Sequence, residues 1–330
     1  MKKLLFTLLS GLIGLSSFGQ IQNIIKPNDI AQGEKLIEAY FTPMAESFGA
    51  GLNSGWYNTA KPHSLGGFDL TFTLNTVIIP NSAETFNIED AGGTTFTSTE
   101  TDAATIFGSE KTTTMDYYSH LTFTDAVGNV IGSGTNPTPI EFEMPGGIKT
   151  PAIPLPMIQA GIGLIKNTAI DIRYMPMLNV GDNINVNLLG IGIKHDLLQW
   201  IPGIGDAIPM SLSLQGGYTS LNTELKILGQ EVSLKTKATT INLVASKKLL
   251  MVTGYVGLGY NSANTTFTTD ANFDLGGIQF NEKVEVAFES NKNLRTNIGL
   301  RLNMAVVTIQ ADYTFAEYPT ATLGLGVSLR

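Results

Sequence analysis

The sequence predicts an all-β fold, a transmembrane antiparallel β-barrel of about 12–14 strands preceded by a short N-terminal helical plug. Three observations predict this class: an export signal, strands whose apolar residues recur at every second position, and links that alternate between short and long. The 330 residues are 43% hydrophobic and only 15% charged, which excludes a disordered chain.

The first 19 residues have the form of a secretory signal peptide. Met1-Lys2-Lys3 is basic, residues 4–18 are uncharged, and Ser17 and Gly19 place small residues at the −3 and −1 positions of a cleavage site. The alternative, a membrane anchor, would need about 20 apolar residues. We therefore expect export, either as a secreted soluble protein or as an outer-membrane barrel. The strand and link patterns below favour the outer membrane of a diderm (Gram-negative) bacterium as the destination.

The predicted barrel occupies residues 65–330, where apolar and polar residues alternate. Ile170 and Ile172, for example, share one face of a strand while Asp171 and Arg173 take the other. Segments of this period and of about 9–11 residues suit tilted membrane strands. A soluble antiparallel sandwich alternates in the same way, so the alternation alone leaves both folds open.

The links between strands separate the two folds. Short links at 166–167, 246–248 and 303–304, and a compact link at 195–207, alternate with longer links. The longer links are residues 177–182, 220–236 and 261–293. Outer-membrane barrels sort their links in this way, with short turns in the periplasm and long loops outside.

The strand count follows from the same alternation. Nine strands are expected between residues 158 and 330, and a further strand begins at Phe68. Residues 115–124 and 130–142 supply two more, and a hairpin of 265–270 with 284–289 would bring the total to the upper value. An even number is expected for a single-chain barrel.

Residues 20–64 differ from the rest and predict the plug. Asn28 or Asp29 can cap a helix whose apolar residues include Leu36 and Phe41. A barrel of intermediate width is too wide to be filled by its wall side chains alone, which favours a plug inside the lumen. The alternative is a helix that lies across the periplasmic mouth.

Two short motifs carry a resemblance to known families. Trp56-Tyr57-Asn58-Thr59-Ala60, followed by Gly66-Gly67, is similar to an aromatic-Tyr/Phe-Asn-Pro-Ala element of long-chain fatty-acid transporter-like outer-membrane barrels, with Thr59 in place of their proline. Residues 192–203 also resemble a recurring element of an uncharacterised family of outer-membrane barrels from diderm bacteria. The first resemblance implies a fourteen-stranded barrel with an N-terminal hatch that passes hydrophobic molecules.

Few residues suggest chemistry. The chain has no cysteine, and its three histidines lie far apart without metal-ligand spacing, so we expect no metal, no cofactor and no enzyme. The net charge of −8 argues against nucleic acid as a partner. His195-Asp196 is interpreted as the start of an interfacial helix, with an outer-membrane lipid hydrolase as the alternative.

The candidate site residues come from the plug and from inward-facing strand positions. They are expected to hold the plug in place or to line a conduit: Trp56, Tyr57, Asn58, Arg173, Arg295 and Arg301. We expect a monomer in contact with outer-membrane lipid that works as a passive uptake channel for small hydrophobic molecules. The alternative is a non-transporting barrel that scaffolds a secretion or surface-assembly complex.

Overall fold

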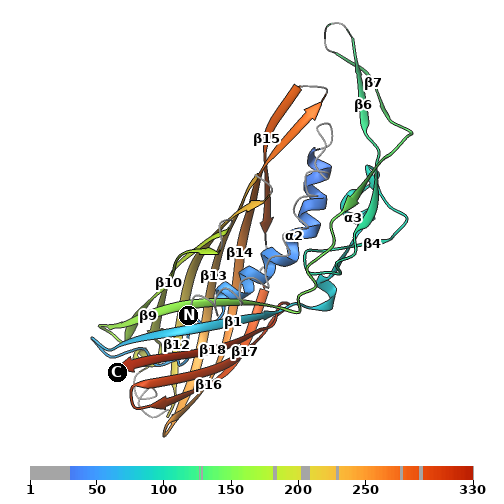
Figure 1. Ribbon diagram of the computed structural model, residues 1–330. Helices are drawn as coiled ribbons and strands as arrows, with labels where there is room; N and C mark the ends of the chain where they lie inside the picture. Colours follow the sequence, from blue (N-terminus) through green and yellow to red (C-terminus); the bar gives the residue numbers. More distant parts are fainter. Residues whose placement is uncertain are drawn as a thin grey trace.

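The computed structural model is a closed β-barrel with one long helix and a small outer subdomain (Figure 1). It describes residues 30–125, 127, 129–180, 184–201, 209–227, 230–275, 278–289 and 293–329. The expected signal peptide, residues 1–19, lies outside the described residues. No helix among those described is both long and apolar enough to cross a membrane.

Within the described residues, ten antiparallel strands form the ring. They are β1 (Phe68–Ile78), β9 (Ala152–Leu164), β10 (Thr168–Val180), β11 (Ile184–Asp196), β12 (Ser211–Ile227), β13 (Gln230–Leu249), β14 (Val252–Leu275), β16 (Asn293–Met304), β17 (Val307–Phe315) and β18 (Thr320–Leu329). The first and last strands close the ring, in a register that runs from Phe68 opposite Leu329 to Val77 opposite Thr320.

The barrel class agrees with the sequence prediction, whereas the count of about 12–14 strands was too high. The nine strands expected after residue 158 and the one beginning at Phe68 are all present in the ring. The segments expected to add two more instead form β5 (Thr113–Tyr117), β6 (His120–Thr124), β7 (Val130–Thr135) and β8 (Ile140–Met144), which pair outside the barrel. Any half-buried antiparallel sheet shows the same alternation of apolar and polar residues. The pattern could therefore not distinguish these four strands from strands of the barrel.

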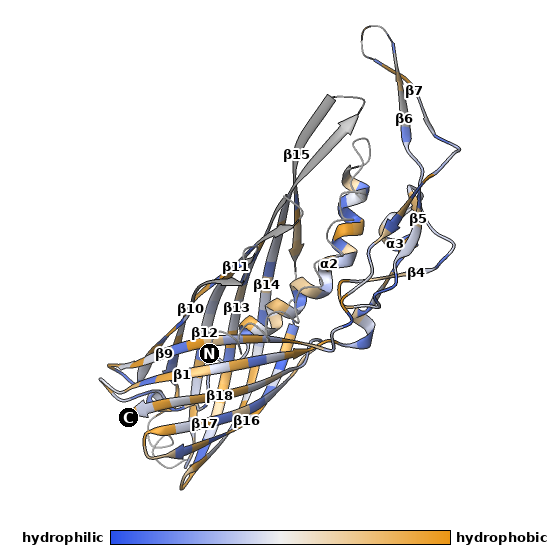
Figure 2. Cartoon of the chain, in the orientation of Figure 1, coloured by the Kyte–Doolittle hydropathy of each residue, from blue (hydrophilic) through white to orange (hydrophobic). Residues whose placement is uncertain are grey.

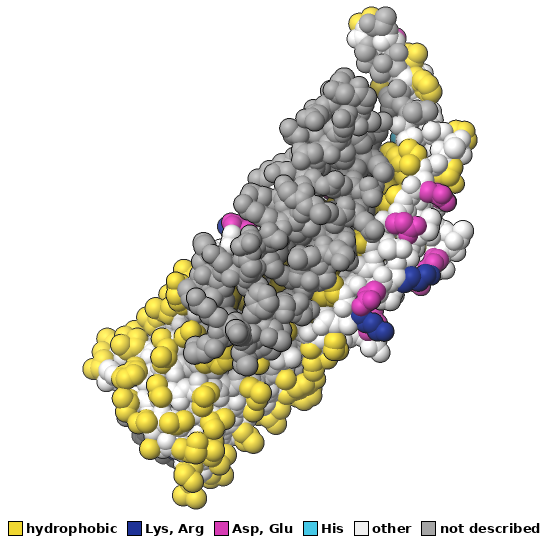
Figure 3. Space-filling view, in the orientation of Figure 1, with side chains coloured by type: hydrophobic (Ala, Val, Ile, Leu, Met, Phe, Trp, Pro, Cys, Tyr) yellow, Lys and Arg dark blue, Asp and Glu magenta, His cyan; other side chains and the backbone are white. Residues whose placement is uncertain are grey.

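The outward face of the barrel is a band of exposed apolar side chains. Figure 2 shows the alternation along the strands, and Figure 3 shows hydrophobic side chains gathered over the lower barrel. On β14, Val256 and Leu258 are exposed on the outer face, whereas the preceding Tyr255 points inward and is buried. The same alternation on β18 exposes Leu323, Leu325, Val327 and Leu329. Such a band is what a bilayer requires of a barrel wall.

The two ends of the barrel differ. At one end, here called the short-turn end, residues 165–167, 250–251 and 305–306 join consecutive strands directly. At the other, the extended end, the links expected to be long loops are mostly strand. There β12 and β13 pair as far as Ile227 and Gln230, and β14 leaves β16 after Asn261 to pair with β15 (Ile278–Glu289).

The outer subdomain is the insertion between β1 and β9, residues 79–151. Besides β5–β8 it contains η2 (Asn81–Ala83), β2 (Thr85–Asn87), α3 (Ile88–Gly92), β3 (Phe96–Thr97) and β4 (Asp102–Ala104). Its strands form three small sheets beside the extended end (Figure 1). A folded unit thus takes the place of a simple link between β1 and β9.

The helix α2 (Ile30–Asn53) connects the subdomain to the barrel interior. Near its start it contacts α3, and Asn53 at its end reaches Ser262 of β14. A buried apolar cluster surrounds it, in which Phe41 stacks on Phe267 with ring centroids 5.0 Å apart. This cluster, here called the upper core, is thus formed by the helix, by the strands at the extended end and by the subdomain.

Candidate functional site

The chain that follows α2 fills the lumen on its way to the short-turn end. Residues 54–64, here called the lumenal segment, begin at the helix end and finish beside the β9–β10 turn, where Gly66 donates to the carbonyl of Gly163. Trp56 and Tyr57 are both buried inside the ring. Together, α2 and this segment pass through the barrel lengthwise.

Glycines on the inner wall make room for the aromatic side chains. A Cβ atom on Gly192 or Gly217 would collide with the ring of Trp56, and one on Gly257 would collide with the Tyr57 hydroxyl. A residue other than glycine at these three positions would require the rings to move, because barrel interiors are packed to near-crystalline density. The wall is therefore shaped to this particular segment.

Arg173 of β10 contacts the chain inside the barrel through its whole guanidinium group. Its two terminal nitrogens donate to the carbonyls of Leu52 and Ser54, each at 2.8 Å, and its Nε donates to Oε1 of Gln159 at 2.9 Å. The guanidinium carbon lies 3.7 Å from the ring centroid of Trp56. A cation at these last carbonyls of α2 also complements the negative end of the helix dipole.

Arg295 and Arg301 contact the same segment from the opposite wall. Arg295 donates to Oδ1 of Asn242 at 2.8 Å and to Oγ of Ser54 at 3.4 Å. Arg301 donates to the side-chain oxygen of Asn58. The structure thus brings Trp56 and Asn58 against two of the three arginines, and the Tyr57 ring packs edge-on against Tyr255 at 6.1 Å.

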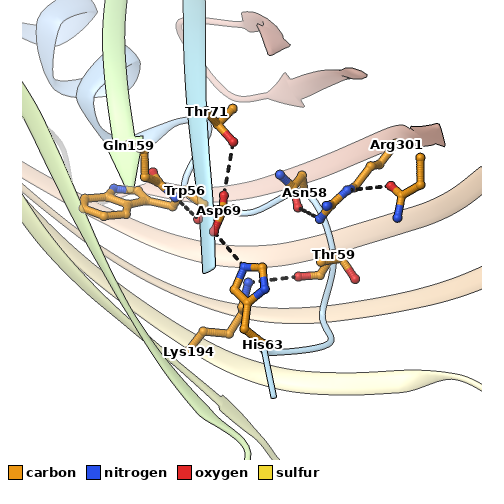
Figure 4. A network of polar contacts seen from close by, with 10 residues as sticks. Trp56, Asn58, Thr59, His63, Asp69, Thr71, Gln159, Lys194 and Arg301 are labelled. Carbon is orange, nitrogen blue, oxygen red and sulfur yellow. Dashed lines mark hydrogen bonds and ion pairs between the residues drawn. The ribbon is translucent and has the colours of Figure 1, made fainter. Parts of the chain in front are cut away.

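A second polar group near the short-turn end was not among the residues singled out from the sequence (Figure 4). His63 Nε2 lies 2.7 Å from Oδ1 of Asp69, and Thr71 donates to the other oxygen of Asp69 at 3.1 Å. Lys194 donates to the carbonyl of Thr59 at 3.4 Å. The alternation of the strands predicts that Asp69 and Lys194 face the lumen. Their partners His63 and Thr59 lie in a segment without regular structure, so these contacts could not be predicted.

Little space remains beside the lumenal segment. The cavity lined by Trp56, His63, Asp69 and Lys194 has a volume of about 10 Å³. A single water molecule needs about 10–15 Å³ of such volume. This part of the lumen therefore has no room for a solute while the segment stays in place.

His195 lies at the short-turn end and not in the lumen. Its Nε2 accepts from Nε1 of Trp200 at 2.8 Å, and its Nδ1 lies 2.8 Å from Oγ1 of Thr168. Trp200 itself is 63% exposed. These contacts suit an interfacial aromatic anchor at the rim of the barrel.

In the part of the chain that the structure describes, no group of three or more His, Asp or Glu side chains is placed to hold a metal ion. The site is a set of wall cations and amides that bind carbonyl and side-chain oxygens of the chain inside the barrel.

Solved structures similar to this chain are membrane barrels at low identity. The translocator domain of the autotransporter NalP from Neisseria meningitidis is 9% identical over 91% of this chain and 97% of that chain, with a TM-score of 0.29. The transport unit of the autotransporter AIDA-I from Escherichia coli is 9% identical over 87% and 97%, also with a TM-score of 0.29. A mutant of the TodX monoaromatic hydrocarbon channel is 10% identical over 86% and 75%, with a TM-score of 0.25. At such low identities and scores, none of these likenesses assigns a function.

The expected kinship with fatty-acid transporters finds no specific support in these comparisons, and no curated protein matches the chain. A family model, in contrast, covers nearly its whole length. That model, described as a family of unknown function (DUF6588), matches residues 1–329, so the chain belongs to this family.

Proposed function

We propose that this protein is an outer-membrane barrel kept closed by its own N-terminal segment, and that it holds the outer subdomain at the cell surface as a platform. The short-turn end then faces the periplasm, because outer-membrane barrels have short periplasmic turns. Export by the signal peptide of residues 1–19 is part of this proposal. A single chain suffices, since β1 closes the ring on β18.

The observation that carries the proposal is that the wall binds the backbone of the chain inside it. Arg173 holds the carbonyls of Leu52 and Ser54, Gln159 donates to the carbonyl of Trp56 at 3.3 Å, and Lys194 holds that of Thr59. Hydrogen bonds that involve a charged group contribute about 1.5–3 kcal/mol each. Several such contacts in one water-poor lumen favour a segment that stays in place.

The experiment compares the full-length protein with a variant that lacks residues 20–60, both reconstituted into planar bilayers. We expect the full-length barrel to show no steady conductance and the variant to show discrete open steps. Heat-modifiable migration on gels checks that both barrels are folded. Steady conductance of the full-length protein, or a folded variant that stays closed, would overturn the proposal.

Passive uptake of small hydrophobic molecules is the second candidate, and one observation favours it. The inner surface at the extended end is apolar, with Leu188, Leu221 and Phe267 buried against α2. A movement of this helix would open an apolar path from outside. Uptake of a hydrophobic fluorescent probe by liposomes tests it: uptake by the full-length protein no faster than by protein-free liposomes removes this candidate.

A further inference from the structure

A small cavity lies where α2 meets the rim of the barrel, apart from the arginine contacts described above. Its volume is about 40 Å³. Side chains from the helix, from β14, from the first residue of β16 and from the β17–β18 turn line it: Glu46, Asn53, Asn261, Asn293, Glu317 and Tyr318. The cavity therefore lies between the helix and the barrel wall.

Two carboxylates share this cavity. The pKa of Glu46 is raised above its ordinary value, mainly by burial and further by the like charge of Glu317. A hydrogen bond from Tyr318 offsets part of this rise. Asn293 donates to Oε2 of Glu317 at 3.1 Å, which orients that carboxylate at the rim. Two negative charges close together in a partly buried site are costly unless a cation lies between them.

Asn53 supplies an independent observation that points to a ligand in this cavity. The residue is 1% exposed, and its Oδ1 accepts no hydrogen bond from the described residues. Its Nδ2 donates to the carbonyl of Ser262 at 3.3 Å. Exchanging the two amide atoms would set an oxygen against that carbonyl, so the orientation with Oδ1 unpaired is the correct one. A buried amide oxygen without a donor costs about 1–3 kcal/mol.

These groups suit one kind of ligand. Carboxylate and amide oxygens are the ligands that hard divalent cations prefer. Ca²⁺ accepts irregular sets of oxygens completed by water, whereas Mg²⁺ demands a near-ideal octahedron. We propose that the cavity binds one Ca²⁺ ion through the carboxylates of Glu46 and Glu317 and Oδ1 of Asn53, with water completing the coordination.

The bound ion would tie the helix to the barrel rim. Glu46 and Asn53 lie seven residues apart on α2, which is two helical turns, and Glu317 belongs to the turn after β17. Ligands from such distant parts of the chain leave no loop motif of the calcium-binding type in the sequence. The ion would thus add a separable contact between the chain inside the lumen and the wall.

Calcium titration of the purified full-length protein, folded in detergent, tests the site. By isothermal calorimetry we expect one bound Ca²⁺ per chain, and a thermal unfolding midpoint that rises with Ca²⁺ and falls with chelator. Glu46→Gln and Glu317→Gln each weaken binding by about ten-fold or more, because affinity depends on the charge of the ligands. Glu89→Gln, at an exposed position of α3, is the matched control and leaves binding unchanged.

A gain-of-function variant distinguishes a ligand from a merely structural residue. Asn53→Asp adds a third carboxylate, so we expect lower stability in chelator and tighter Ca²⁺ binding than in the natural protein. Should Glu46→Gln fail to fold, the exposed Glu317 and Asn53→Asp carry the test. Absence of a Ca²⁺ effect in the natural protein, or an equal effect in all variants, would overturn the proposal and leave water as the occupant.

Discussion

Arg173 is a single buried cation that binds the backbone of the chain inside the barrel. The residue is 1% exposed, and its nitrogens donate to two carbonyls and one amide while its plane lies against Trp56. A buried arginine is tolerated only when its donors find acceptors, and here Leu52, Ser54 and Gln159 supply them. Wall and segment therefore depend on each other.

Replacing Arg173 should loosen the lumenal segment. Arg173→Gln removes the charge and at least one of the carbonyl contacts, so we expect the free energy of unfolding to fall by about 2–4 kcal/mol. The chain has two tryptophans, so in a Trp200→Phe background the fluorescence of Trp56 reports its surroundings alone. It should shift to the red as the ring gains contact with water.

The control for this prediction is an exposed ion pair. Lys111 and Glu100 lie 2.7 Å apart with side chains that are 72% and 43% exposed, and such pairs contribute little. Lys111→Ala should leave the unfolding midpoint and the Trp56 emission unchanged. If Arg173→Gln behaved like Lys111→Ala, the assigned role of Arg173 would be wrong.

Two neighbouring glycines test which face of β12 looks inward. A Cβ on Gly217 would collide with Trp56, while one on Gly216 meets nothing closer than Ile193 at 3.8 Å. Gly217→Ala should cost about 1–3 kcal/mol through overpacking. Gly216→Ala should be neutral or slightly stabilising, because alanine loses less entropy on folding. Equal effects in chemical unfolding experiments would show that the inward and outward faces are misassigned.

At the scale of elements, the sequence predicted the strands of the ring correctly and wrongly placed the strands of residues 115–142 in the same ring. From residue 158 onward, bulky apolar residues at every second position correspond to strands of the ring. Residues 115–142 alternate in the same way, yet their strands form small sheets over the upper core. The period of two records that one face is buried, and it does not record whether lipid or protein covers it.

The helix inside the barrel was only partly predictable. The start near Asn28 or Asp29 and the apolar face through Leu36 and Phe41 follow from local rules. That the helix continues past Pro43, and that Arg173 meets its end, depends on contacts between residues more than 100 positions apart. The periodicity of the sequence does not predict such contacts. It did predict that all three arginines face the lumen.

Strand β14 offers a test of membrane depth within one element. Val252 lies next to the short turn and Val256 near the middle of the stretch that pairs with β16, and both are exposed. Arginine at the bilayer midplane costs about 2–4 kcal/mol, and near the interface about 0–1 kcal/mol. Val256→Arg should therefore destabilise the barrel in lipid vesicles clearly more than Val252→Arg does. Equal costs would place this strand outside a bilayer.

Considered as a whole, the molecule has two interiors. Near the short-turn end the lumen is polar and binds the lumenal segment through arginine, lysine and amide side chains. At the extended end it is apolar, and α2 and the subdomain complete a core like that of a soluble protein. Most of the exposed apolar side chains among the described residues lie on the outer surface of the barrel near the short-turn end (Figure 3), and a few others, such as Phe123 and Ile131, lie on the subdomain.

The account depends most on that outer surface lying in lipid, and spin labels can test this directly. The chain has no cysteine, so single cysteines can carry nitroxides without background. Labels at Val256, Ile298 and Leu325, reconstituted into vesicles, should collide readily with dissolved oxygen and hardly with a water-soluble nickel complex, while a label at Lys111 should do the reverse. Equal access of the nickel complex to all four positions would contradict the membrane barrel.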